Sequence, residues 1–360
     1  MKIKLFFFFL FTGTLIFADP SLCDCDSCVY IRRPDKCNTC PPPPPSTCAY
    51  NAPVSTGIGC MWKAALGASF VYFQAKQDNM QLALKPKSIT DTSVNSNVID
   101  TNWEYNTGYK VKGIFYLMHD SWDLTAGYFN FHNSYSTSAS AYDQLPMIPY
   151  FYDATASNLE LDSLTSRWKL QIDLITGEIG RKYYVGRNLF IRTFFGGEGG
   201  WIDQKLTIDY NTTQTGSLIT IPYESNSCNW CAGPRIGMQT EWETSCFFRF
   251  IADGSISILY TEYNNKYLNQ TLEGSTPDIL TNEVRFNTMC FLRPHLSMLL
   301  GISWGNYVHC NSWFFDVLVG YQADVFFDQN PFGKPDNSLY TFTNDNLYLH
   351  GLVISATVEF

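Results

Sequence analysis

The 360-residue sequence has few charged residues. Lys, Arg, Asp and Glu together make up 16% of it, against about 25% in an average soluble domain. Acidic residues outnumber basic ones, and the net charge of −9 argues against a nucleic-acid partner. Histidine is scarce, and no G-x-S-x-G, H-E-x-x-H or phosphate-binding glycine loop is present. We therefore expect neither an enzyme nor a bound cofactor.

The sequence also lacks a second long apolar run. Beyond the first segment, no stretch reaches about 18 apolar residues, so no helical membrane span is expected. At the start, Lys2 and Lys4 precede a short apolar segment that ends in a small-residue cleavage site at Ala18. This pattern predicts a secretory signal peptide over residues 1–18, and a retained N-terminal anchor is the alternative.

Aromatic residues are abundant, at 16% of the chain, and apolar residues alternate with polar ones in ten segments. In residues 105–117, Tyr105, Tyr109 and Val111 share one face, and Lys110 and Lys112 share the other. A period of two predicts β-strands. The segments are longer than the five or six residues that are usual in soluble sheets, and aromatic residues lie near their ends. Both features are typical of strands that cross an outer membrane, although a secreted β-sandwich shares the alternation.

The connections alternate between long and short. Long polar stretches cover residues 77–103, 133–165, 205–229, 262–282 and 328–345, and the short connections are "MHDS" (118–121), "VGRN" (185–188), "ETS" (243–245) and "WGNYVHCNS" (304–312). Outer-membrane barrels have long external loops and short periplasmic turns. The fold class is therefore predicted to be all-β. We expect a transmembrane, antiparallel, up-and-down β-barrel of about ten strands over residues 61–360, with both chain ends periplasmic. Twelve strands are the alternative if "KLTIDY" (205–210) and "LITIPY" (218–223) cross the membrane, but we favour an extension of one hairpin.

Three stretches carry a family resemblance. They are "GYKVKGIFYLMHDSWDLTAGYFNF" (108–131), "EIGRKYYVGRNLFIRTFFGGEGGWIDQ" (178–204) and "AGPRIGMQTEW" (232–242). They resemble the major outer-membrane protein family first known from Legionella, which also occurs in chlamydia-like bacteria. The final "ATVEF" resembles the carboxy-terminal assembly signal of outer-membrane barrels. The resemblance covers roughly residues 60–360 and implies a pore-forming barrel in the bacterial outer membrane.

The polar faces of the strands are expected to line the barrel interior, where charges of both signs are nearly balanced. The pore-lining candidates are Lys110, Lys112, Asp123, Arg167, Lys169, Asp173, Arg192, Glu198, Arg235, Glu241, Arg249, Asp253, Arg285, Arg293, Asp316 and Asp324. A wet interior would pass small hydrophilic solutes or ions by passive diffusion. In a barrel this narrow, the same side chains can instead fill the interior with ion pairs. The alternatives are therefore a structural, non-conducting envelope protein, or an adhesin that uses the long loops.

Twelve cysteines are the remaining chemical signal. They are Cys23, Cys25, Cys28, Cys37, Cys40, Cys48, Cys60, Cys228, Cys231, Cys246, Cys290 and Cys310. The first seven lie in or at the end of a cysteine- and proline-rich arm over residues 19–60, which resembles chlamydial envelope proteins in its cysteine density. The two C-x-x-C pairs of the arm match zinc spacing, but an oxidising compartment favours disulfides, so we expect no metal.

The cysteines are expected to form several kinds of bond. "CNWC" (228–231) predicts a disulfide within a loop. Seven is an odd number, so at least one arm cysteine stays unpaired or bonds outside the arm. The expected partners are outer-membrane lipid, small hydrophilic solutes, and disulfide-linked neighbours or other cysteine-rich envelope proteins.

Overall fold

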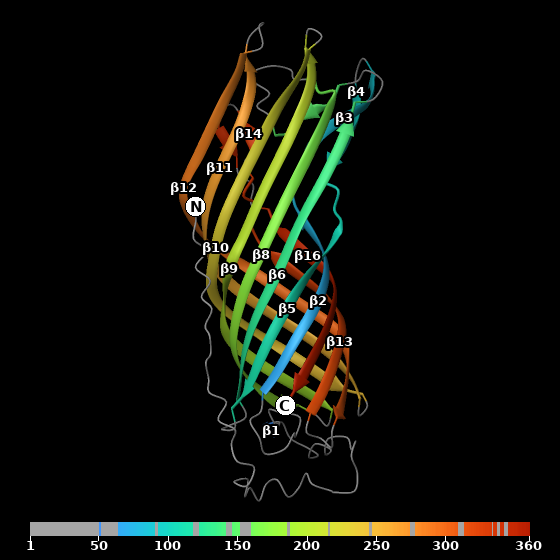
Figure 1. Cartoon of the computed structure of the whole chain (residues 1–360), viewed down its shortest axis with the longest axis vertical. Coiled ribbons are helices and arrows are strands. Elements are labelled where there is room, and N and C mark those ends of the chain that lie inside the picture. The colour runs from blue at the N-terminus through green and yellow to red at the C-terminus, as the bar shows by residue number, and fades with distance from the viewer. Residues whose placement is uncertain are drawn as a thin grey trace, which may run out of the picture.

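The computed structural model describes residues 50–51, 64–90, 93–117, 122–141, 146–151, 160–185, 188–214, 217–244, 247–273, 278–308, 313–332, 334–336, 339–341 and 345–360. Ten antiparallel strands form a closed barrel (Figure 1). They are β2 (Ala64–Gln77), β5 (Tyr105–Tyr116), β6 (Trp122–Ser140), β8 (Ser163–Tyr184), β9 (Leu189–Gln214), β10 (Ser217–Glu243), β11 (Phe248–Glu273), β12 (Asp278–Val308), β13 (Trp313–Phe326) and β16 (Leu347–Glu359). Each strand pairs with its neighbour in chain order, and β16 pairs with β2 to close the ring. The predicted ten-stranded, up-and-down barrel is confirmed.

The two ends of the barrel differ. At the turn end, β5 meets β6, β8 meets β9, β10 meets β11 and β12 meets β13, and short hydrogen-bonded connections such as Val185 N to Leu189 O (2.9 Å) join the strands. Ala64 and Phe360 also lie there, joined by two backbone hydrogen bonds of 2.9 Å. The opposite end is the loop end. Among the described residues, no helix has the length and apolar character needed to cross a membrane.

Six short strands accompany the barrel. At the loop end, β3 (Gln81–Thr90) pairs with β4 (Ser93–Asp100) and with β7 (Ile148–Pro149), and β14 (Lys334–Asp336) pairs with β15 (Leu339–Thr341). At the turn end, β1 (Tyr50–Asn51) pairs with the last residues of β8. The other residues of the predicted signal peptide and arm lie outside the described residues.

Two segments that we expected to be loops are strands. Residues 205–229 continue β9 and β10, and Leu206 pairs with Ser225. Most of residues 262–282 likewise continues β11 and begins β12. The stretches "KLTIDY" and "LITIPY" therefore extend one hairpin, as we favoured, and add no further membrane strands. We predicted loops here because both segments are rich in polar residues. These strand extensions lie beyond the lipid-facing wall, however, and there the outer face of a strand can be polar.

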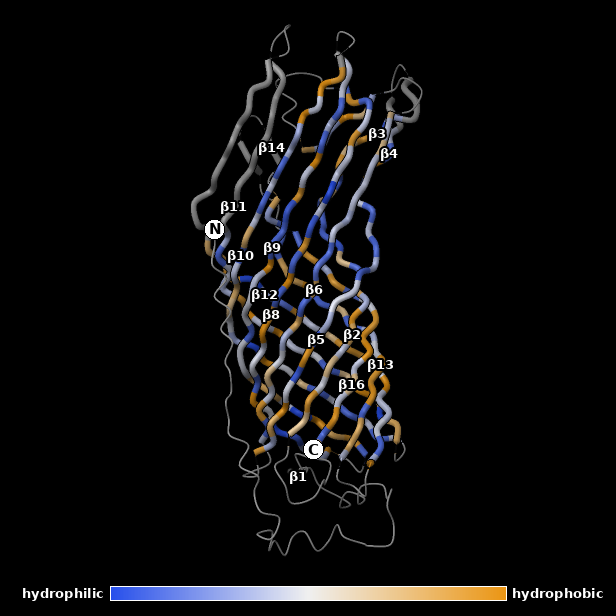
Figure 2. Tube along the Cα trace, viewed as in Figure 1, coloured by the Kyte–Doolittle hydropathy of each residue, from blue (hydrophilic) through white to orange (hydrophobic). Residues whose placement is uncertain are grey.

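The outer wall shows where the lipid lies. Exposed aliphatic side chains such as Ile236, Met238 and Leu300 cover its middle, and aromatic residues flank them on both sides. The girdle nearer the loop end contains Tyr72, Tyr105, Tyr109, Tyr128, Trp201, Trp230, Tyr260 and Tyr321, and the girdle at the turn end contains Phe115, Trp122, Trp242, Phe248, Trp304, Trp313 and Phe360. Figure 2 shows strong hydrophobic colouring along this lower part of the barrel. A lipid-facing band between two aromatic girdles is the outer surface of a transmembrane barrel.

The hydrophobic core lies inside the loop-end half. In β8, Trp168, Leu170 and Ile172 are fully buried and point inward, although we expected them to face lipid. The alternation itself was predicted correctly, but its direction was wrong. Beyond the girdle nearer the loop end, which we term the upper girdle, water and not lipid surrounds the barrel. Burial of the apolar face inside the barrel is therefore favoured there.

Candidate functional site: the barrel interior

Charged side chains fill the turn-end half of the interior and form what we term the interior ion network. Arg235, from β10, donates from Nε to Glu178 of β8 at 3.0 Å and from Nη1 to Glu198 of β9 at 2.9 Å. The Glu198 side chain is only 1% exposed and also accepts a hydrogen bond from the Ser257 hydroxyl. The Arg235 guanidinium thus joins β8, β9 and β10, and the Glu198 carboxylate links β11 to them.

Arg192 makes a second group in this network. Its guanidinium pairs with the Asp123 carboxylate of β6 and lies 3.7 Å from Glu178. The Phe194 ring packs against both guanidinium groups, with its centroid 5.2 Å from Arg192 and 5.9 Å from Arg235. Cations that stack on an aromatic face keep favourable electrostatics while shielded from water.

A third group lies nearer the turn end. Arg249 pairs with Asp316 and lies 3.7 Å from Glu241, which also accepts a 2.8 Å hydrogen bond from Lys182. The Ser303 hydroxyl donates to the same Asp316 oxygen. These links cross β8, β10, β11, β12 and β13 and tie together opposite arcs of the wall.

The fourth group lies where the network meets the core. His295 Nδ1 is 2.9 Å from Glu198, its Nε2 is 3.8 Å from Asp324, and its ring stacks on Phe326 at 3.9 Å. Lys110 Nζ donates to Gln322 at 2.7 Å. Beyond Phe326 toward the loop end, the polar interior gives way to apolar side chains.

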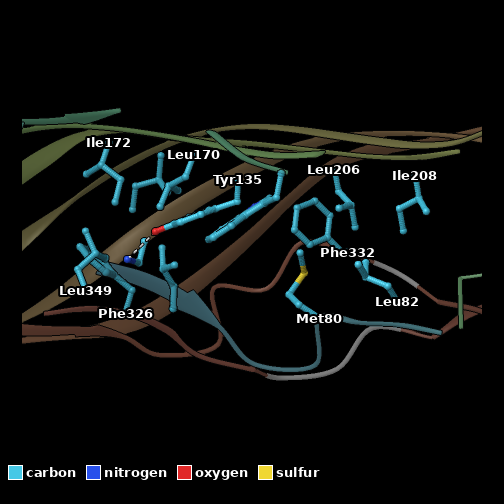
Figure 3. Packing of buried hydrophobic residues seen from close by; sticks show 14 of the residues in the cluster. Met80, Leu82, Tyr135, Leu170, Ile172, Leu206, Ile208, Phe326, Phe332 and Leu349 are labelled. Atoms are coloured by element: carbon cyan, nitrogen blue, oxygen red, sulfur yellow. Dashed lines mark hydrogen bonds between the residues drawn. The ribbon is translucent and has the colours of Figure 1, made fainter. Parts of the chain in front are cut away.

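The apolar side chains of the loop-end interior form what we term the plug. Figure 3 shows Met80, Leu82 and Phe332 lying among side chains of the surrounding wall, such as Leu206 and Ile208. Its members are Val71, Phe73, Ala75, Met80, Leu82, Ala83, Phe131, Tyr135, Met147, Phe151, Leu161, Leu164, Trp168, Leu170, Ile172, Leu174, Ile202, Leu206, Ile208, Tyr210, Ile221, Tyr223, Cys231, Leu259, Phe326, Phe332, Leu347, Leu349 and Val353. The plug fills the barrel between the ion network and the loop end.

Three connecting segments enter the plug and are fixed there by hydrogen bonds. The Tyr210 hydroxyl donates to the Leu82 carbonyl at 3.1 Å and accepts from the Phe151 amide at 3.3 Å. The Gln204 side-chain amide donates to the Gln329 carbonyl at 3.2 Å. Segments that follow β2, precede β8 and follow β13 therefore close the same space.

Most of the predicted interior residues face inward. This group contains Lys110, Lys112, Asp123, Arg192, Glu198, Arg235, Glu241, Arg249, Asp253, Arg293, Asp316 and Asp324. Whether they line a conducting pore is a separate prediction. The side chain of Arg285 lies outside the described residues.

Three candidates are corrected. Arg167, Lys169 and Asp173 of β8 lie on the outer wall, because the apolar residues between them occupy the interior. Sequence reasoning also missed Glu178, Lys182 and His295. A signal was available for His295, which lies two residues after the predicted candidate Arg293 on β12 and therefore shares its face.

The cysteines correct a further expectation. Cys228 and Cys231 lie in β10, where Cys228 is exposed outside and Cys231 is buried in the plug. Residues three apart in a strand point to opposite faces, so the predicted local disulfide does not form. Cys290 is exposed on β12. The remaining candidates, Cys23, Cys25, Cys28, Cys37, Cys40, Cys48, Cys60, Cys246 and Cys310, lie outside the described residues.

Comparison with known proteins decides the family. Residues 60–360 match the model of the family described as Legionella pneumophila major outer membrane protein precursor. The chain belongs to this family. The resemblance seen in the sequence is confirmed, and membership places the barrel in the outer membrane. A search of curated individual proteins finds no match.

Solved structures of other outer-membrane barrels are more distant. The outer-membrane protease OmpT of Escherichia coli is 10% identical, with a TM-score of 0.45, and the match covers 83% of this chain and 96% of OmpT. The attachment invasion locus protein Ail of Yersinia pestis is 7% identical, with a TM-score of 0.22, over 84% and 100% of the two chains. The monoaromatic hydrocarbon channel CymD is 11% identical, with a TM-score of 0.30, over 87% and 94%. None of these likenesses is close enough to suggest a function.

Proposed function

We propose that the protein is a gated, porin-like channel of the outer membrane for small hydrophilic solutes or ions, with its loop end outside the cell. The observation that carries this proposal is the division of the interior into a charged half and an apolar half. The plug demonstrates that this sequence can fill a barrel with apolar side chains. Buried ion pairs are a weak source of stability compared with such packing, so the ion network requires another explanation.

A passage that becomes hydrated only when the channel opens provides that explanation, since the charges are paired and largely buried in the closed barrel. Charges of both signs around a narrow interior attract ions and polar solutes and exclude apolar ones. In this proposal the plug is the closed gate, because its members are almost completely buried inside the loop-end half of the barrel. Solutes would pass when the segments around Leu82, Phe151 and Phe332 leave the barrel, and long connections can move without disturbing the strand ladder.

Planar-bilayer recording tests this proposal. We expect the wild-type protein to show rare, small unitary openings, and the double variant Leu82→Ala, Phe332→Ala to open far more often. Phe250→Ala is the matched control, because Phe250 is exposed on the lipid-facing wall and its loss leaves the plug intact. If wild type and plug variant both fold but neither conducts, the channel proposal is wrong and a structural barrel remains.

We also propose that the protein cross-links the envelope through disulfides. Cys228 and Cys290 are both exposed on the outer wall, beyond the girdle residues Trp230 and Tyr260. Cys228 lies on β10 and Cys290 on β12, so β11 separates the two thiols. Each thiol can therefore reach a neighbouring protein more easily than it can reach the other. When native envelopes are separated on gels without reductant, we expect bands of higher molecular mass that contain this protein. These bands should be weaker in the double variant Cys228→Ser, Cys290→Ser than in wild type. If the bands of higher molecular mass are unchanged in this double variant, other cysteines form the cross-links and this proposal is wrong for Cys228 and Cys290.

We further propose that the protein is not an enzyme. Its buried His295 lies between two carboxylates, an arrangement that can serve acid–base chemistry. However, its side chain is 5% exposed and is covered by Phe326, so a polymeric substrate has no access to it. Incubation of the folded protein with unstructured peptides is expected to release no fragments.

A further inference from the structure

The outer wall of β8 and β9 carries a basic hollow beyond the upper aromatic girdle. The hollow has a volume of about 320 Å³ and is lined by Thr165, Arg167, Lys169, Lys205, Thr207 and Asp209. All six side chains point away from the barrel, since the residues that alternate with them, such as Trp168 and Leu206, are buried in the plug. The hollow therefore faces the surroundings of the barrel and not its interior.

Two of its three cations are available to a ligand. Lys205 pairs with Glu224 at 2.6 Å, and both side chains are well exposed, so this ion pair is weak and exchangeable. Within the part of the chain that the structure describes, no ion pair involves Arg167 or Lys169. Asp209 is the one carboxylate in the lining, so the lining is positive overall.

Two outward-facing carboxylates lie on the membrane side of the hollow. Asp203 of β9, opposite Gln171, is the nearer one and accepts a hydrogen bond from the Asn229 amide at 3.2 Å. The second is Asp173, two residues farther along β8. Asp173 accepts hydrogen bonds from the Tyr128 hydroxyl at 2.7 Å and from the Asn130 amide at 2.6 Å. His132 Nε2 lies 3.4 Å from its other oxygen. Both carboxylates thus have hydrogen-bond partners of their own, and among the described residues neither forms an ion pair with Arg167 or Lys169.

The hollow lies at the outer border of the lipid headgroup layer. Asp173 pairs with Trp201 of the girdle, and Lys169 follows four residues farther toward the loop end. At about 3.3 Å per residue this is roughly 13 Å along the strand. A strand tilt of about 40° reduces it to roughly 10 Å along the membrane normal. Arg167, two residues farther along the strand, lies at roughly 15 Å by the same arithmetic. The headgroup layer is about 5–8 Å deep on each side, so both backbone positions lie outside it, and the long Lys169 and Arg167 side chains reach the outer phosphates by extending toward the membrane.

From these observations we infer that the basic hollow binds the phosphate groups of an anionic lipid in the membrane leaflet at the loop end. Arg167 offers a planar, two-pronged donor that suits phosphate oxygens, and Lys169 and Lys205 add point charges. Ser134 and Ser136 of β6 lie opposite Lys169 and Arg167 on the same exposed face and can donate further hydrogen bonds. The lipid's acyl chains would lie against the aliphatic band below, beside Ile175.

Native mass spectrometry of the full-length protein in neutral detergent tests this inference. Bisphosphorylated lipid A, its dephosphorylated form and inorganic phosphate serve as three separate probes. We expect wild type to bind the bisphosphorylated lipid at least tenfold more tightly than the dephosphorylated one. Free phosphate should bind negligibly, because the acyl chains contribute to affinity. Each basic side chain near a membrane surface contributes about 1 kcal/mol, so Arg167→Gln, Lys169→Gln should weaken binding about 30-fold.

The control is Lys76→Gln, Arg181→Gln, which removes the same charge from other sites on the outer wall. Lys76 lies on β2, and Arg181 lies near the turn end between the Trp122 and Tyr183 rings. This variant should bind lipid as wild type does. Equal weakening by both double variants would mean that only overall charge matters, and equal affinity of wild type for the two lipid forms would mean that phosphate is not recognised. Either result overturns the inference, and neither depends on whether the barrel conducts.

Discussion

Single residues in the interior are stabilised as members of groups. Arg235 balances the negative charge of both Glu178 and Glu198. The side chains of these two residues are only 11% and 1% exposed, so neither carboxylate has appreciable contact with water. Removal of one cation leaves buried negative charge that no solvent can screen. An interior charge here should therefore be far more sensitive to substitution than a charge on the outer wall.

Arg235→Gln tests this expectation. We expect the free energy of unfolding in urea, measured in detergent micelles, to fall by about 3 kcal/mol. Arg167→Gln is the matched control, since Arg167 lies outside and has no ion pair among the described residues; its change should stay within about 0.5 kcal/mol. Similar losses in the two variants would contradict the view that burial sets the cost.

At the same scale, the sequence predicted part of the site. Strict alternation was enough to place Arg192, Glu198 and Arg235 on the inner face. It failed for Arg167 and Lys169 because alternation does not reveal which face is inside. That choice depends on whether lipid or water surrounds the strand, and the boundary between them follows from the whole barrel.

At the scale of the element, β9 depends on glycine. A Cβ placed on Gly196 would lie 1.9 Å from the Gly177 carbonyl oxygen and 2.8 Å from Glu178 Cα, both on the neighbouring β8. A Cβ on Gly197 would meet only the Gly233 carbonyl oxygen, at 3.6 Å, which is ordinary contact. The glycine-rich "GGEGG" (196–200) therefore permits close packing of β9 against β8 at Gly196.

Gly196→Ala and Gly197→Ala form a matched pair on adjacent positions. The first should reduce stability by about 1–3 kcal/mol, because β8 and β9 must separate to admit the methyl group. The second should be nearly neutral. Urea midpoints followed by far-UV circular dichroism provide the measurement, and equal midpoints for the two variants would argue against close packing at Gly196.

Element lengths were the least predictable part of the fold. All ten strands were expected, but β11 and β12 continue well beyond their predicted ends at the loop end. Polar residues such as Asn264 and Lys266 suggested a loop. In a barrel that extends beyond the membrane, however, polar residues on the outside of a strand face water. Composition alone does not separate these cases.

For the whole molecule, the barrel consists of two halves with opposite polarity. In the turn-end half, apolar side chains face out and charges face in, whereas in the loop-end half the apolar side chains are inside. The same continuous strands form both. The loop-end half is therefore built like a water-soluble barrel with its own core, and it should contribute much of the stability of the molecule.

Two tryptophans test this division. Trp168→Ala removes a side chain with 0% exposure from the plug and should cost about 3–5 kcal/mol of unfolding free energy. Trp201→Ala removes a girdle side chain that is 55% exposed to the membrane side, and its cost should be much smaller. Urea titration followed by gel mobility of the folded form is suitable, because it does not depend on tryptophan fluorescence. A larger loss of unfolding free energy for Trp201→Ala than for Trp168→Ala would contradict the view that the core of the loop-end half provides much of the stability.

The change of polarity at the upper girdle also fixes how deeply the protein sits in the bilayer. A shift of the barrel toward its turn end would bring Arg167 and Lys169 into hydrocarbon, and a shift toward its loop end would expose Ile236 and Leu300 to water. Either displacement is unfavourable, so the immersion depth is set from both sides. A bilayer thicker than the band must thin locally around the barrel, which couples insertion to membrane thickness.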